Sequence, residues 1–445
     1  FLRRALWSKP AQAIKAVTKA GVRKRAYLNT PREALECAGI DPGKVTIHYI
    51  DHHRAHAASA FFFSGFEEAA FLTLDGVGEL TATTLGHAGP GGMEVLKEFC
   101  DPDSLGFFYS AMTDYLGFEH MDGEYKVMGM APYGHADKIN FSGMVSYKKG
   151  VYRVSDRYCN PVRRKRYAPD KWFSRAMVKR FGPPRRGDQL SEPYIHVAAA
   201  TQHKLEEITI RLLEDYLAEP LKKSGGKLCF SGGCALNVKL NHRLIEHPLV
   251  SKLWVQPASS DSGISLGAAA YVANQLGDKV ELMKHVYYGP EYDNEEIEAV
   301  FESDKFKVTR VSGIERTAAE LLAAGEVVGW FQGRMEWGPR ALGNRSILGN
   351  PTIRGTADKI NEIIKFRETW RPFCPSILEE HAFDVMDTAH ESPFMTFCFK
   401  VRSKWRSRIP EVVHVDHTAR PQFVNSGQNP RFYSLIENFY KCSGV

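Results

Sequence analysis

A mixed α/β fold is predicted by the alternation of strand-like and helix-like stretches along the sequence. Apolar runs of strand length occur at 69–74, 227–230 and 253–255, and each leads into a turn that contains glycine. The last of these turns precedes the alanine-rich helical stretch Ile264–Leu276. Apolar residues near helical spacing between Ile195 and Tyr216 predict a further, long core helix. Such alternation is typical of α/β proteins.

Composition narrows the class of protein. The 445 residues allow two or three domains of about 150 residues each. Hydrophobic residues make up 43% of the chain, and no run of about 18 apolar residues predicts a membrane span. The eight cysteines form no C-x-x-C pair. A disulfide framework is not expected at this chain length and cysteine density, which favours a reducing cytosol and a cytoplasmic location. The net charge of +6 suits anionic small molecules such as nucleotides, and it permits nucleic acid without requiring it.

Two histidines form the first candidate site. The run Val45–Ile50 is interpreted as a strand and Ala57–Phe63 as the continuation of a helix that begins at Asp51–His56. On that helix His52 and His56, four residues apart, lie on one face and can bind one metal ion. The alternative is a polar helix start, capped by Asp51, with scattered histidines.

A carboxylate and a glycine-rich segment follow. Asp75 comes after the strand 69–74, where it can present oxygen to a ligand, and the same residues can form a hairpin to a strand at 80–85. A strand is expected at 93–99 and a helix at 104–116. The segment Gly123–Gly134, with Lys126 and Gly129, is interpreted as a shaped loop that either binds a ligand or is purely structural. The basic stretch 146–190, with Arg163–Arg166, is interpreted as a solvated insertion rather than an acceptor-binding or nucleic-acid lobe.

Two strand-to-helix turns carry further candidates. Gly232 and Gly233 precede Asn237 at a turn that suits phosphate or ribose. Asp261 lies at the next such turn, where it is either a helix N-cap or a ligand carboxylate.

A domain boundary is expected at 278–310, and basic residues dominate beyond it. A strand at 308–311, a helix at 315–324 and a strand at 327–331 begin the second segment. Its arginines lie on glycine-rich or helix-like stretches, which favours binding of phosphate or carboxylate over surface ion pairs with Glu336, Glu368 and Asp416. The basic residues are Arg334, Arg340 and Arg345 in 333–346, Lys365, Arg367 and Arg371 in the helix-like 361–371, and Arg420.

Together these motifs resemble the ATP-dependent O-carbamoyltransferases of nodulation-factor and antibiotic biosynthesis. The resemblance implies an actin-like, sugar-kinase-like domain at 1–290 and a YrdC-like domain, incomplete at its C-terminus, at 300–445. It also implies that carbamoyl phosphate and ATP form carbamoyl adenylate in the second domain, and that the first domain, holding iron, transfers the carbamoyl group to a hydroxyl of a small molecule or sugar. The matching segments are Asp51–His56, Leu74–Glu79, Gly123–Gly134, Ser231–Asn237, Gln256–Gly263, Gly329–Pro351, Asn361–Ser376 and His414–Gln422.

The resemblance also implies roles for single residues. The metal, Fe(II) or another divalent ion, is assigned to His52, His56 and Asp261, and catalysis to His52, His56 and Asp75. ATP, with Mg, is assigned to Asp75, Lys126, Gly129, Gly232, Gly233 and Asn237. Carbamoyl phosphate is assigned to Arg340, Arg345, Lys365, Arg371 and Arg420. Two imidazoles and a carboxylate leave open positions on an iron-type ion, and the cations can neutralise a phosphate.

The sequence departs from the family pattern in three places, and other functions are also compatible with its motifs. The chain lacks the family's first strand and its final run beyond Val445, so it looks trimmed at both ends, and Cys374 replaces a residue that is more often small. The alternatives are a tRNA threonylcarbamoyl-transfer protein and a non-catalytic nucleotide-binding module. A metallopeptidase is disfavoured because position 53 is His rather than the Glu of H-E-x-x-H. A homodimer is left open, and no membrane partner is expected.

Overall fold

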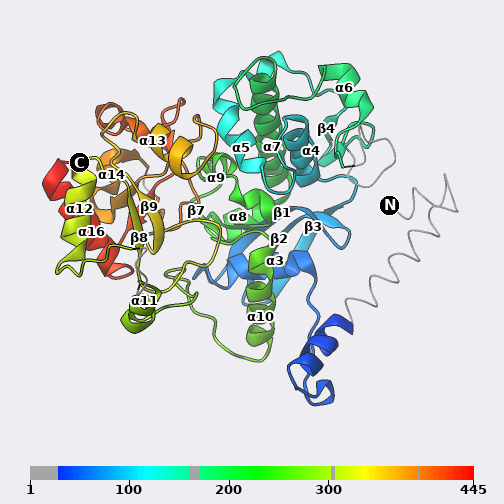
Figure 1. Cartoon of the computed structure of the whole chain (residues 1–445). Coiled ribbons are helices and arrows are strands. Elements are labelled where there is room, and N and C mark those ends of the chain that lie inside the picture. Colours follow the sequence, from blue (N-terminus) through cyan, green and yellow to red (C-terminus); the bar gives the residue numbers. More distant parts are fainter. Residues whose placement is uncertain (1–28, 160–169, 302–305, 389) are drawn as a thin grey trace.

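The computed structural model of the protein describes residues 29–159, 170–301, 306–388 and 390–445. It confirms the mixed α/β fold (Figure 1). The main sheet has the strand order β3-β2-β1-β6-β7, in which β3, β2 and β1 are antiparallel and β1, β6 and β7 are parallel. Its strands are β1 (Ala69–Gly78), β2 (Thr81–Gly89), β3 (Gly92–Cys100), β6 (Lys227–Ser231) and β7 (Lys252–Val255).

The central strand β1 is buried on both faces, which explains its unbroken apolar run. Leu72 and Leu74 join the large core beneath α4 (Leu105–Tyr115) and α7 (Tyr194–Tyr216). Phe71 points the other way and packs in a second cluster with Ala57 and Ala60 of α3 (His52–Phe61). Alternate residues of a strand point to opposite faces, so helices on both sides bury the side chains of residues 69–75.

The helices α3 and α10 (Ile264–Gln275) lie together on one side of the main sheet, and α4, α5 and α7 lie on the other (Figure 1). The approach of α10 to α3 requires glycine. A Cβ atom at Gly267 would lie 1.9 Å from the backbone oxygen of Ala55 and 2.8 Å from the Cβ of Ser59. The position of α3, and therefore of His52 and His56, depends on this contact.

Gly267→Ala is expected to push α3 away from α10. Overpacking of this kind typically costs about 1–3 kcal/mol of folding free energy, and a displaced α3 should also weaken any ligand that binds its histidines. Thermal unfolding and cobalt titration measure the two effects. Gly329→Ala is the control, because its Cβ would meet nothing within 4 Å. An unchanged unfolding temperature for Gly267→Ala would contradict the tight contact.

The C-terminal part has its own small core and several short sheets. Helices α12 (Ile314–Ala323) and α16 (Pro430–Ser443) pack together with Trp330 and Phe432 in that core. The sheets pair β8 with β9, β10 with β14, and β11, β12 and β13 in order. Their strands are β8 (Val328–Phe331), β9 (Arg345–Leu348), β10 (Ser376–Leu378), β11 (Met386–Asp387), β12 (Phe399–Val401), β13 (Thr418–Ala419) and β14 (Gln422–Val424).

The remaining elements are short. Residues 29–37 are also helical. The helices are α5 (Glu124–Met130), α6 (Arg175–Phe181), α8 (Ala218–Lys223), α9 (Val238–Ile245), α11 (Asn294–Phe301), α13 (Thr356–Lys359), α14 (Ala382–Val385) and α15 (Ser403–Arg406), and the hairpin is β4 (Val145–Lys148) with β5 (Val151–Val154). The single-turn helices are η1 (Pro42–Lys44), η2 (Ala131–Tyr133), η3 (Ala136–Lys138), η4 (Gly233–Leu236), η5 (Asp261–Gly263), the π-type η6 (Ile360–Ile364), η7 (Glu379–His381) and η8 (Pro410–Val412).

Four predictions of local structure are wrong. Residues 45–50 and 308–311 are not strands; most of their side chains are exposed, and they pair with no strand among the described residues. The segment Gly123–Gly134 is not a loop but forms α5 and η2, because Val127 and Met130 bury themselves in the main core. Only the start of 361–371 is helical, since η6 ends at Ile364. The basic run Arg163–Arg166 lies outside the described residues.

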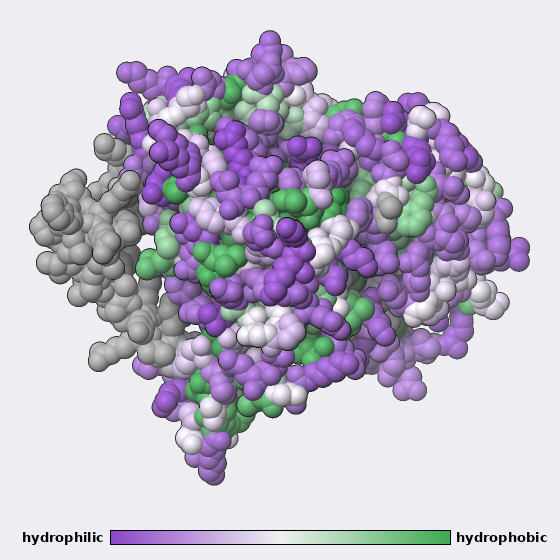
Figure 2. Space-filling view, turned by 180° about the vertical axis from the view of Figure 1, so that it is seen from behind, coloured by the Kyte–Doolittle hydropathy of each residue, from purple (hydrophilic) through white to green (hydrophobic). Residues whose placement is uncertain are grey.

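The other predicted elements are confirmed: the helices begun at 52, 104, 195, 264 and 315 and the strands at 69, 80, 93, 227, 253 and 327 occur within a few residues of the expected bounds. None of the helices in the described part of the chain combines the length and the apolar character needed to cross a bilayer. Figure 2 shows one face of the molecule, on which hydrophobic areas are small and separated by hydrophilic ones.

Candidate metal centre and anion site

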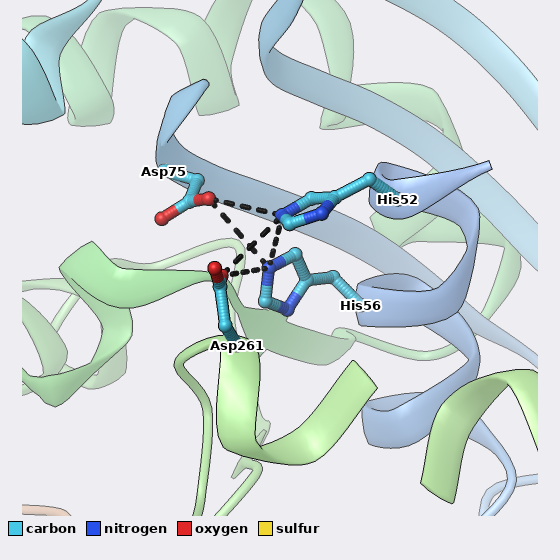
Figure 3. A group of neighbouring side chains, drawn as sticks. All are labelled: His52, His56, Asp75 and Asp261. Carbon is cyan, nitrogen blue, oxygen red and sulfur yellow. Dashed lines mark hydrogen bonds and ion pairs between the residues drawn. The ribbon is translucent and has the colours of Figure 1, made fainter. Parts of the chain in front are cut away.

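Two histidines and two aspartates converge at one point (Figure 3). Their ligand atoms all lie within 4.8 Å of one another. The Nε2 atoms of His52 and His56 are 3.1 Å apart. His52 Nε2 lies 3.2 Å from Asp75 Oδ2 and 3.5 Å from Asp261 Oδ1, and His56 Nε2 lies 3.7 Å from each carboxylate.

The fold explains why these four meet. The histidines occupy the first turns of α3, Asp75 lies in β1 where its ladder becomes irregular after Leu74, and Asp261 begins η5 after β7. The strands β1 and β7 both flank β6 in parallel, so their carboxyl ends reach the same edge of the sheet. Asp261 does not cap α10, whose N-cap is Gly263. The structure thus groups the three predicted metal ligands and adds Asp75 to them.

Because the cluster is largely buried, its histidines and aspartates strongly affect one another's pKa values. His56 is fully buried and Asp75 nearly so, whereas the Asp261 side chain is largely exposed. Burial alone would raise the pKa of Asp75, but hydrogen bonds from His52 and His56 outweigh it and hold that pKa well below its usual value. Burial likewise opposes charge on His56, yet its bonds to Asp261 and Asp75 leave its pKa raised.

The donor set fits a divalent metal. Two imidazoles with carboxylates suit first-row divalent ions and leave positions for other ligands. Within the part of the chain that the structure describes, the buried Nδ1 of His56 has no hydrogen-bond partner, so its Nε2 contacts are the only polar ones of that ring. The neighbouring His53 points elsewhere and bonds Thr73 Oγ1 through Nδ1 at 2.6 Å. Burial and the His56 charge lower the pKa of His53 to about 4.

The glycine turn after β6 lies against the cluster. The Gly233 amide donates to Asp75 Oδ1 at 3.0 Å. A Cβ at Gly232, where φ is 91°, would lie 2.4 Å from the backbone oxygen of Leu74. Both glycines therefore have a packing role beside any nucleotide role. Asn237 is engaged as the N-cap of α9 and in two hydrogen bonds with Gln202.

A pair of neighbouring cations, Arg340 and Arg420, lies at the end of the same turn. Arg340 is buried and donates to Leu236 O at 3.2 Å and to Pro257 O at 3.5 Å. Burial and the nearby charge of Arg420 lower the pKa of Arg340 to about 9. Arg420 Nε lies 3.1 Å from the sulfur of Cys374. Among the described carboxylates, none is within 4 Å of either guanidinium.

A second group of cations surrounds residues 365–371. Partial desolvation and the charges of Arg367 and Arg371 lower the pKa of Lys365. Glu368 bonds Lys126 at 2.9 Å and Arg371 at 3.6 Å, and so compensates only part of this charge. Lys126 is therefore linked to this group of cations by its ion pair with Glu368, while Gly129 packs near Trp370.

Arg345 and Glu336 organise the glycine-rich loop instead of pairing with each other. Arg345 donates to the backbone oxygens of residues 332, 333 and 344 and covers the ring of Phe331. The buried Glu336 carboxylate accepts from the amides of Leu342, Asn344 and Arg345 at 2.8–3.1 Å. The sequence analysis missed this role, because a carboxylate that binds amides leaves no pattern in the sequence.

Glu336→Gln is expected to destabilise the protein by about 2–4 kcal/mol, since a neutral amide replaces a charged acceptor of several buried N–H groups. Thermal unfolding measures the change. Glu94→Gln is the control, because Glu94 is exposed on β3. A shift no larger than that of Glu94→Gln would contradict the role of Glu336.

An apolar cavity of about 330 Å³ lies in the C-terminal part. Phe373, Cys374 and Phe432 contribute to its wall. None of the residues predicted to bind metal, ATP or carbamoyl phosphate lines it. The candidate site is therefore outside this cavity, at the cluster and at the two groups of cations.

Comparison with known proteins gives consistent matches. Residues 11–270 match the family model described as the carbamoyltransferase N-terminus, and residues 319–445 match that of the carbamoyltransferase C-terminus. The chain is 36% identical over 425 residues to the uncharacterized protein sll1178 of Synechocystis, covering 87% of this chain and 68% of that protein. It is 36% identical to nodulation protein NolNO of Sinorhizobium fredii, covering 91% and 58%, and 37% identical to nodulation protein NolO of Bradyrhizobium diazoefficiens, covering 89% and 71%. The chain thus spans less than two thirds of NolNO.

Proposed function

Because the chain belongs to the carbamoyltransferase family, we propose that it carbamoylates a hydroxyl group of a small molecule or sugar. In this proposal carbamoyl phosphate, water and ATP give carbamoyl adenylate, inorganic phosphate and pyrophosphate. The acceptor hydroxyl then attacks the carbamoyl carbon, loses its proton and displaces AMP. The observation that carries the proposal is the 232–237 turn, at which the Gly233 amide bonds Asp75 of the cluster and the Leu236 oxygen accepts from Arg340. Each group has the chemistry that one of the two steps needs.

The cations serve the first step. Arg340, Arg420, Lys365 and Arg371 bind the phosphate of carbamoyl phosphate and the phosphates of ATP. Only Arg371 among them pairs with a described carboxylate, that of Glu368. The remaining positive charge suits this role because guanidinium and ammonium groups form strong hydrogen bonds with phosphate oxygens. ATP is bound with Mg. Water first cleaves carbamoyl phosphate to carbamate and inorganic phosphate. A carbamate oxygen then attacks the α-phosphorus of ATP, which forms carbamoyl adenylate and releases pyrophosphate.

The cluster serves the second step. His52, His56, Asp75 and Asp261 would hold a divalent metal, with Fe(II) as the favoured ion. When bound, such an ion polarises a carbonyl or phosphoryl oxygen as a Lewis acid. Asp75 is oriented by the Gly233 amide, and the close packing of Gly232 on Leu74 keeps that amide in place. The turn thereby aligns the cluster with a nucleotide bound beside it.

Pyrophosphate release from ATP by the full-length protein tests the proposal. Release that depends on carbamoyl phosphate supports the adenylate step. Binding of ATP and metal without such dependence would refute the proposal and favour a nucleotide-binding module. Tight binding of tRNA in a filter assay would favour threonylcarbamoyl transfer instead.

A further inference from the structure

Arg340 occupies a place that anion binding alone does not explain. Its two terminal nitrogens donate to carbonyl oxygens of two different turns, those of Leu236 and Pro257. Its Nε is buried and has no hydrogen-bond partner among the described residues. The two terminal nitrogens of the guanidinium therefore join two turns, and its Nε–H donor is unused among the described residues.

Each of these turns supports one carboxylate of the cluster. The Leu236 oxygen ends η4, the same single turn whose first amide, that of Gly233, donates to Asp75. Pro257 lies in the tight segment that leads to Asp261, in which a Cβ at Gly263 would lie 2.3 Å from Ala258 O. The preceding Gln256 bonds the backbone of Ser59 in α3.

We propose that Arg340 is a positioning residue for the metal centre, whose guanidinium bridges the two turns that place Asp75 and Asp261. The inference rests on the proposed function, because it requires that the cluster binds metal. Arg340 comes from the C-terminal part of the chain, so it ties the metal ligands to the segment that carries the cations. Partners that hydrogen-bond a metal ligand directly typically change metal affinity by about 10–100-fold. Arg340 acts one step further out, through the backbone, so the lower end of that range is expected.

The chemistry of arginine makes the bridge specific. Its planar fork fixes two nitrogens at a set separation, whereas lysine offers one nitrogen on a flexible stem. Arg340→Lys therefore keeps the charge and removes the bridge. Arg420→Lys is the matched control, since Arg420 carries a neighbouring charge but bonds Cys374 and neither turn.

Cobalt(II) binding by the metal-free, full-length protein tests the inference through the d–d absorption of the ion. Arg340→Lys is expected to weaken cobalt binding about tenfold, and Arg420→Lys to change it less than about twofold. If Arg340→Lys misfolds by circular dichroism, Arg340→Gln replaces it. Removing a nearby positive charge would by itself strengthen cobalt binding, so a loss in Arg340→Gln would support the bridge more strongly.

Equal cobalt affinity in Arg340→Lys and the unaltered protein would overturn the inference, as would an equal loss in both lysine variants. Absence of cobalt binding by the unaltered protein would refute the metal site itself, and this inference with it. Failure of the proposed function is thus distinguished from failure of the bridge.

Discussion

His52→Ala is expected to abolish carbamoyl transfer by the full-length protein while carbamoyl phosphate still drives pyrophosphate release from ATP. His52 Nε2 is the atom closest to the other members of the cluster, within 3.5 Å of His56, Asp75 and Asp261. Loss of outer-shell contacts already costs about 10–100-fold in metal affinity or activity, so loss of a direct ligand should cost more than 100-fold in transfer. The cations of the first step are untouched by this change.

Product carbamate and pyrophosphate, measured in the same reaction, test the expectation. His48→Ala is the control, because this exposed histidine lies four residues earlier and outside the cluster. Loss of both steps in His52→Ala would refute the division of work between the two groups. Full retention of transfer would refute the catalytic role of the cluster.

The sequence predicted the fold best where local pattern and burial coincide. The run 69–74 is a strand because helices cover both faces of β1, and α10 follows β7 as its alanine-rich pattern indicates. The segment 45–50, also apolar in part, is largely exposed and forms no strand, because a strand also needs a partner and no local pattern encodes one. The family resemblance is confirmed, since it rests on several motifs together.

The site residues, too, were predicted correctly where their proximity is set by local spacing and missed where it is set by tertiary packing. The spacing of His52 and His56 is local, so a helix brings them together as expected. The proximity of Asp75 to both histidines depends on the packing of α3 against β1, which spacing along the sequence does not reveal. The glycines and arginines of 333–346 suggested an anion site. In the structure, backbone amides of that loop already donate to the Glu336 carboxylate, so they are not free to bind an anion. Arg345 donates to backbone oxygens.

Lys365→Met is expected to show the opposite pattern to His52→Ala: carbamoyl phosphate-dependent pyrophosphate release should fall by about 100-fold or more. Lys365 lies beside Arg367 and Arg371, whose charges lower its pKa. Three neighbouring cations with one carboxylate, itself shared with Lys126, leave positive charge that a phosphate group can neutralise. Methionine keeps the length of the side chain and removes the charge.

Lys359→Met gives a matched control, because Lys359 is an exposed residue at the end of α13 and its replacement removes the same charge. Pyrophosphate release should be normal in this variant. Cobalt affinity should be normal in Lys365→Met as well, since Lys365 contacts neither the cluster nor the two turns joined by Arg340. Equal losses in both variants would indicate a general effect of net charge. If only Lys365→Met fails, and fails without weaker metal binding, the adenylate step depends on this cation rather than on the metal centre.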